Sequence, residues 1–124
     1  MTAMFLFALS FNQDLSKWDV SRVTGMKMMF RFAQSFNQDL SNWDVSRVVN
    51  MESMFDEATS FQQTLCGAAW VNSKASKDKM FIHSLGSISD TACGTWRMLW
   101  RQSIFVGHIS FHFIFFLLAF SHSR

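Results

Sequence analysis

The stretch from Met29 to Val48 reads MFRFAQSFNQDLSNWDVSRV, and nearly the same string, MFLFALSFNQDLSKWDVSRV, begins 25 residues earlier at Met4. A third copy begins at Met54 as MFDEATSFQQTL and departs from the pattern at Cys66. Self-similarity at a fixed period of this length is the signature of repeat proteins, in which each copy is one structural unit stacked on the next. The sequence therefore predicts an array of three 25-residue repeats.

Composition agrees with one repeated structural unit. The chain has 124 residues, 49% of them hydrophobic, which favours one domain with a buried core over a disordered chain. It holds 15 Phe, 9 Met and 5 Trp but no Pro or Tyr, a bias that indicates reuse of the same residue choices. The net charge is only +2 and no run of Lys or Arg occurs, so no nucleic-acid partner is predicted.

The spacing of apolar residues within one copy predicts its local structure. Met26, Met29, Phe30 and Ala33 stand at positions i, i+3, i+4 and i+7, which is one face of a short helix. The segment 40–48 places apolar residues between Ser, Asp and Asn, which fits a short strand bounded by turns. Each 25-residue copy, here called a coil, is therefore expected to contain one short helix and one short strand.

Neither element buries its apolar face alone at this length, so stacking of neighbouring coils must close the core. Equivalent side chains of successive coils then form rows along the array. The predicted packing rows are Met4, Met29 and Met54; Phe5, Phe30 and Phe55; Phe11, Phe36 and Phe61; Leu15, Leu40 and Leu65; and Trp18 with Trp43.

The string Met-Phe-x-x-Ala-x-Ser-Phe-Asn-Gln-Asp-Leu-Ser-x-Trp-Asp-Val-Ser-x-Val resembles the repeat of the BspA-like leucine-rich-repeat surface proteins. The resemblance covers residues 1–75 as repeats, and the segment from Cys66 to Cys93 is similar to a closing segment of protist members. It implies a leucine-rich-repeat-like solenoid, used at cell surfaces for adhesion or protein recognition, without catalysis. The expected organisation is three repeats over 1–75, a closing cap over 76–93 and an apolar tail over 94–124.

Met1 aligns with Met26 and Met51, so the first repeat is expected to be truncated at its start. A solenoid normally shields its first coil with an atypical capping repeat, and none stands here. We expect the natural protein to extend further, and any leader would lie in that extension because the first ten residues lack a basic region and a cleavage site. With a leader, the protein is expected at the cell surface or secreted.

Two cysteines, Cys66 and Cys93, flank the closing segment. A bridge between them would close a 28-residue loop and, on the chain-entropy model, stabilise the fold by roughly 3 kcal/mol. The alternative is two buried free thiols, which behave as small hydrophobes.

The tail from 104 to 120 carries no formal charge over 17 residues, the lower edge of what spans a bilayer. Two histidines and a serine within it weigh against a membrane helix, and the basic residues before it would orient the repeats toward the cytosol. Three interpretations stay open: a transmembrane helix, non-native read-through sequence after Cys93, and an apolar helix packed on the repeats.

Residues that carry chemistry are few. His108 and His112 share a helix face but have no further ligand nearby in sequence, so no metal site and no cofactor are predicted. Aspartates recur one coil apart, where they are expected to stack and to bond turn backbone rather than calcium. Neither a nucleophile elbow nor a phosphate-binding glycine loop occurs, so the chain is not expected to be an enzyme. The stacked aspartate pairs are Asp14 with Asp39 and Asp19 with Asp44.

The candidate binding face is the exposed side of the row of predicted strands, where Lys17, Arg22, Asn42 and Arg47 are expected to project between the buried positions. The predicted function is a non-catalytic protein-interaction or adhesion module that recognises an unidentified protein or glycan. The alternative is a membrane-anchored structural protein whose repeats act only as a spacer. A merely solvated face is the competing explanation for each of the four residues.

Overall fold

Residues 1–94 are described by a computed structural model, in which the chain divides into two units, Met1–Ala92 and Cys93–Arg124. Regular elements are short within the described part. Strand β1 is Thr64–Leu65, helix α1 is Ala68–Val71 and strand β2 is Ser87–Ile88. The two strands pair in parallel, with Thr64 opposite Ser87. The remaining described residues form turns, bends, isolated bridges and segments without regular structure.

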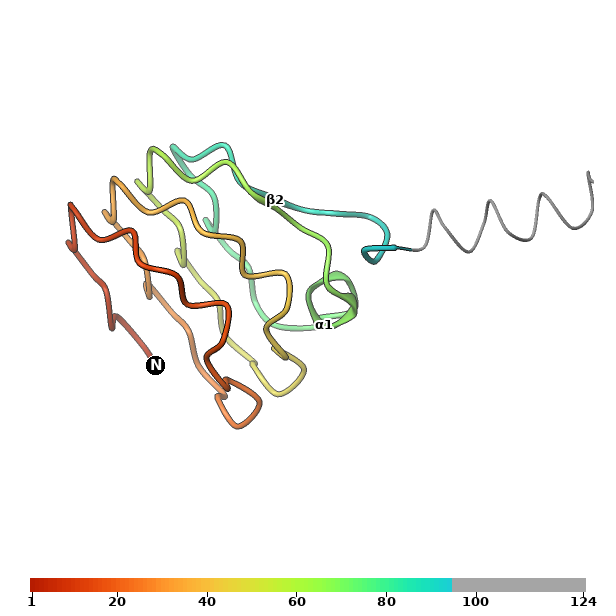
Figure 1. Cartoon of the computed structure of the whole chain (residues 1–124). Helices are drawn as coiled ribbons and strands as arrows, with labels where there is room; N and C mark the ends of the chain where they lie inside the picture. Colours follow the sequence, from red (N-terminus) through yellow and green to blue (C-terminus); the bar gives the residue numbers. More distant parts are fainter. Residues whose placement is uncertain (95–124) are drawn as a thin grey trace, which may run out of the picture. The chain divides into compact units, whose positions relative to one another are not determined.

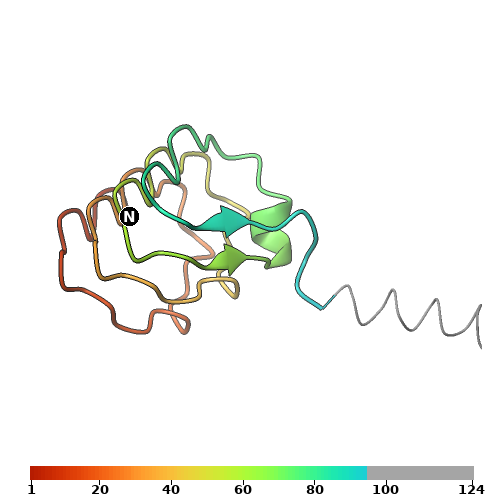
Figure 2. The ribbon, with the colours of Figure 1, turned by 90° about the horizontal axis from the view of Figure 1, so that it is seen from above.

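Successive coils lie side by side in the first unit, and Figures 1 and 2 show the same segment of each coil running next to its equivalent. Asn50 bridges in parallel to Gly25 of the preceding coil and to Ser76 of the following one. Alternate backbone N–H groups of the second coil donate to carbonyls of the third at 2.8–2.9 Å. The donors Met26, Met28, Phe30 and Phe32 meet the acceptors Asn50, Glu52, Met54 and Asp56.

The helix expected over Met26–Ala33 is not formed. Every second N–H of this segment donates to the next coil. The N–H groups between them close local turns by donating to the carbonyl three residues earlier, as from Met29 to Met26. Met28 and Phe32 have φ angles of 54° and 59°, outside any right-handed helix. The helical spacing still selects the buried face, because Met26, Met29, Phe30 and Ala33 are all fully buried. The periodicity thus identified the inward side chains but not the backbone that presents them.

The strand expected over 40–48 is replaced by two consecutive turns. The N–H of Trp43 donates to the carbonyl of Leu40 at 3.0 Å, and that of Val48 donates to the carbonyl of Val45 at 3.0 Å. The first coil repeats both bonds at residues 15–18 and 20–23. Aspartate and serine side chains that bond nearby backbone offer the chain an alternative to a sheet ladder, which explains the difference.

The core is a set of columns that run through the coils. Phe30 lies between Phe5 and Phe55, with ring centroids 5.3 and 5.5 Å away, and the rings are almost parallel. A second column contains Phe36 and Phe61, with centroids 6.0 Å apart. Within one coil the columns touch, since Phe30 and Phe36 have centroids 4.1 Å apart. Such offset ring contacts add to the free energy of burying apolar area.

The segment expected as a closing cap, 76–93, begins as a fourth, partial coil. The third coil donates to it through the N–H groups of Ser53, Phe55 and Glu57, at 2.8–2.9 Å. Phe81 continues the phenylalanine column with its ring centroid 5.5 Å from that of Phe55. The step from Phe55 to Phe81 is 26 residues instead of 25, which hides the fourth copy from an exact 25-residue comparison.

Helix α1 carries a substitute for the third tryptophan. Trp43 and Trp70 are both buried, and each donates its indole N–H to a leucine carbonyl of the preceding coil at 2.8 Å. The acceptors are Leu15 and Leu40. Although the Trp-Asp-Val-Ser string does not recur in the third coil, Trp70 therefore performs the same packing two residues later in the chain.

The remaining expectations concern the tail and the membrane. Residues 104–120, proposed as a membrane helix, lie outside the described residues, as do His108 and His112. Within residues 1–94, the structure contains no helix with the length and apolar character needed to cross a bilayer.

Candidate functional site

The candidate surface is built from the paired turns of the first two coils. In each coil the sequence Asp-apolar-Ser-x-apolar occurs twice in succession, as in residues 14–18 and 19–23. The leading aspartate accepts a hydrogen bond from the serine N–H, and the last residue donates to the carbonyl of the first apolar residue. The variable position therefore lies in the turn between two apolar residues, and in the second coil both of these residues are buried.

All four predicted face residues occupy this variable position. Lys17, Arg22, Asn42 and Arg47 are exposed. Within residues 1–94, neither arginine has a carboxylate within ion-pair distance. Two coils thus present exposed arginines at equivalent positions.

Serine hydrogen bonds lower the pKa of three of the aspartates that support these turns, Asp14, Asp19 and Asp44. Hydrogen bonds from the Ser21 side chain and backbone, at 2.6 and 3.0 Å, lower the pKa of Asp19, and the nearby Arg22 lowers it further. Ser46 lowers the pKa of Asp44 in the same manner, first through its side chain, while the charge of Asp19 acts in the opposite direction. The interaction between the two carboxylates shows that equivalent aspartates of neighbouring coils are close.

These aspartates behave as turn caps. One oxygen of each carboxylate is occupied by the serine two residues ahead, and Asp14 and Asp39 make the same backbone bond at 2.8 and 2.9 Å. A polar ladder stands in the segment just before them, where Asn12 accepts from the Asn37 N–H at 2.9 Å and Asn37 accepts from the Gln62 N–H at 3.0 Å. The polar side chains of this edge therefore tie one coil to the next.

The burial of the predicted packing residues depends on the coil in which they lie. Those of the second and third coils are buried, with exposures of 0–1%. In the first coil Leu15 is buried, Phe5 and Phe11 are half-buried, and Met4 and Trp18 are 50% and 42% exposed. The first coil has a neighbour on one side only in the described structure, which accounts for the difference.

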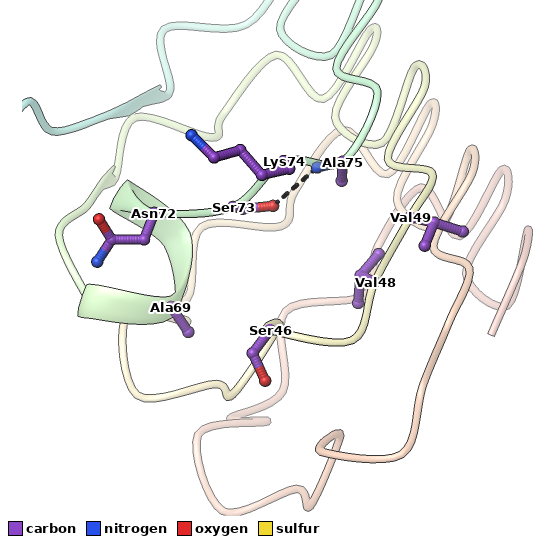
Figure 3. Close-up of a pocket in the computed structure, with 8 residues that line it drawn as sticks. All are labelled: Ser46, Val48, Val49, Ala69, Asn72, Ser73, Lys74 and Ala75. Atoms are coloured by element: carbon purple, nitrogen blue, oxygen red, sulfur yellow. Dashed lines mark hydrogen bonds between the residues drawn. The ribbon is translucent and has the colours of Figure 1, made fainter.

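A pocket of about 260 Å³ lies between α1 and the second coil. Its walls are mainly small or aliphatic, and include Val48, Ala69 and Ala75, while Figure 3 shows the Lys74 and Asn72 side chains directed away from its centre. The Ser73 hydroxyl oxygen accepts a hydrogen bond from the Ala75 N–H at 3.3 Å. The pocket brings no acid, base and nucleophile together.

Sequence reasoning missed a row of charges along the coils. Lys27 pairs with Glu52 at 2.9 Å, and Arg31 pairs with Asp56 at 2.8 Å, each across one coil step. His83 Nδ1 lies 2.8 Å from Glu57 Oε1, across the 26-residue step. The 25-residue offset of the two acids from their basic partners was visible in the sequence, whereas the position of His83 depended on the changed period.

Both cysteines of the chain are oxidised. Cys66 and Cys93 are both disulfide-bonded, and no free cysteine occurs in the described chain. The Cys66 N–H also donates to the Ser41 hydroxyl at 3.2 Å.

A family model described as "Mycoplasma protein of unknown function, DUF285" matches residues 1–96. The chain belongs to the DUF285 family. The DUF285 match takes in every described coil, the paired turns and both cysteines. No curated protein and no solved structure matches the chain. The description of DUF285 assigns no function.

Proposed function

We propose that this chain is a non-catalytic recognition or adhesion module, a segment of a leucine-rich-repeat-like solenoid of the BspA-like kind. The observation that supports the proposal most is the pair of exposed arginines, Arg22 and Arg47, at equivalent turns of adjacent coils. Both stand on turns fixed by aspartate and serine hydrogen bonds, so their backbone positions are set before a ligand arrives. Preorganised contacts lose less conformational entropy on binding than flexible ones.

The chemistry of the surface favours a ligand with repeated anionic or hydroxyl groups, as on a protein or a glycan. A guanidinium presents several N–H donors in one plane and binds carboxylates in a bidentate manner. Two such groups on neighbouring coils allow one ligand to bind at both, and linked contacts raise overall affinity above that of either alone. The ligand therefore need not enter a deep pocket.

The test is a charge reversal, Arg22→Glu with Arg47→Glu, in the full chain. We expect binding of protein-coated beads to cells or matrix to be lost, while the circular dichroism spectrum stays unchanged because both side chains are exposed. The matched control is Lys74→Glu with Lys79→Glu, which makes the same change in net charge at other exposed positions. Undiminished adhesion by the folded arginine variant would reject the proposal and leave the spacer function.

We further infer that the protein works at the cell surface or after secretion. Disulfides persist in oxidising compartments and are rare in the cytosol, and both cysteines of this chain are disulfide-bonded. The intact mass of the natural protein, measured with and without reduction before thiol alkylation, tests this inference. Alkylation only after reduction supports an exported protein, whereas alkylation of both cysteines without reduction contradicts it.

A further inference from the structure

Three side chains that can bind a metal ion converge on the third and fourth coils. Asp56, Glu57 and His83 each offer one donor atom, and these atoms all lie within 4.8 Å of one another. Asp56 is buried, Glu57 is partly exposed, and the His83 side chain is 67% exposed. The donors are thus supported on one side by the protein and open to water on the other.

The charges around the cluster favour a cation. Arg31 donates its Nε–H to Oδ2 of Asp56 at 2.8 Å, which neutralises that carboxylate but involves only one of its two oxygens. Glu57 faces the imidazole of His83, which carries no charge unless it is protonated. When the His83 imidazole is neutral, the side chains of Arg31, Asp56, Glu57 and His83 together carry a net charge of −1. Binding of a divalent ion changes this net charge to +1.

The donor set identifies the class of ion. An imidazole nitrogen with two carboxylate oxygens suits zinc and related first-row ions, whereas calcium and magnesium prefer oxygen ligands alone. Bond lengths of about 2.0–2.2 Å place two ligands of one zinc ion roughly 3–4 Å apart. The donor atoms lie within 4.8 Å of one another, and the His83 side chain, which is 67% exposed, has room to adjust to this spacing.

We propose that Asp56, Glu57 and His83 form a zinc site that joins the third coil to the fourth, partial coil. Three protein ligands leave one position of a tetrahedral ion for water. The ion replaces the direct contact between Glu57 Oε1 and His83 Nδ1 with coordination bonds to both residues. Zinc bound only by the folded chain then stabilises it by mass action.

The experiment uses the full chain carrying His108→Ala, His112→Ala and His122→Ala. Because the chain has four histidines, His83 is then the single one left. We expect zinc chloride to bind with one ion per chain in calorimetric titration, to raise the melting temperature and to shift the ring proton signals of His83. Adding His83→Gln or Glu57→Gln should weaken zinc binding by at least about tenfold.

The matched control is Glu52→Gln, which removes the acid of the neighbouring Lys27 pair and leaves the three donors intact. Zinc affinity should not change in this variant. The proposal is overturned if the single-histidine chain binds no zinc, if its His83 ring signals do not move, or if affinity is indifferent to Glu57→Gln. The ring proton signals of His83 are measured in the single-histidine chain, in which Asp56, Glu57 and His83 are all unchanged. They therefore test the proposal even if the His83→Gln or Glu57→Gln variant does not fold.

Discussion

Trp43 donates its indole N–H to the backbone carbonyl of Leu15, 28 residues earlier in the chain, at 2.8 Å. Both residues are buried, so the bond satisfies a carbonyl that water does not reach. Trp70 makes the same bond to Leu40 one coil later. These tryptophans therefore supply specific hydrogen bonds between coils in addition to apolar area.

Replacing Trp43 with phenylalanine should destabilise the protein by about 1–3 kcal/mol, because the Leu15 carbonyl stays buried without its donor. The matched change is Trp18→Phe, at a position that is 42% exposed, where an effect within about 0.5 kcal/mol is expected. Urea unfolding followed by circular dichroism measures both. Equal losses in the two variants would show that the hydrogen bond is unimportant.

Gly86 lies against the rings of Phe61 and Phe81. A methyl group there would overlap the Phe61 ring and stand 3.0 Å from that of Phe81. We expect Gly86→Ala to cost about 1–3 kcal/mol through overpacking. Gly25→Ala is the control, since its nearest neighbour, the Thr2 hydroxyl, is 3.5 Å away. A neutral Gly86→Ala in the same thermal melts would contradict this packing.

Lys79 has a φ of 53°, in the left-handed region that costs a non-glycine residue free energy. Because its side chain is exposed, Lys79→Gly should raise stability by up to about 1 kcal/mol. Lys74 is exposed without a positive φ, so Lys74→Gly should instead lower stability, by about 0.4–1 kcal/mol. If Lys79→Gly and Lys74→Gly shift the melting temperature in the same direction, the positive φ at Lys79 is wrong.

Acid should loosen the paired turns. Hydrogen bonds from serines lower the pKa of Asp14, Asp19 and Asp44 in the folded protein, so their contribution to stability is complete above the ordinary aspartate pKa of about 3.9. It is lost as pH falls below that value and through the lower folded pKa values. Replacing the three with asparagine keeps an acceptor oxygen and should flatten the stability profile below about pH 4. An equally steep fall in the triple variant would assign acid sensitivity to other groups.

The spacing of apolar residues in the sequence correctly predicted which side chains are buried, but it did not predict the backbone conformation. The positions of Met29, Phe30 and Ala33 correctly marked the inward face, because stacking requires the same side chain inward in each coil. The helix expected there does not form, since the hydrogen-bond partners of its N–H groups lie in the next coil and not in the segment itself.

Of the two candidate sites, one could be predicted from the sequence and the other could not. Arg22 and Arg47 could be selected from the repeat, because the positions of Asp, Ser and the apolar residues confine the variable residue to the outside of a turn. The cluster around His83 could not, because one inserted residue between Phe55 and Phe81 changes which residues become neighbours. Only the observed register between the third and fourth coils brings Glu57 opposite His83.

The parallel bonding of equivalent positions in successive coils also bears on heredity. Neighbouring copies have nearly identical amino-acid sequences, and recombination between the DNA segments that encode them would add or delete whole coils. Each such event would preserve the aromatic columns and the polar ladder, because every position meets its own equivalent across the new junction. The number of coils is thus a trait that genomes can change in single steps, while the pattern presented by each coil is inherited unaltered.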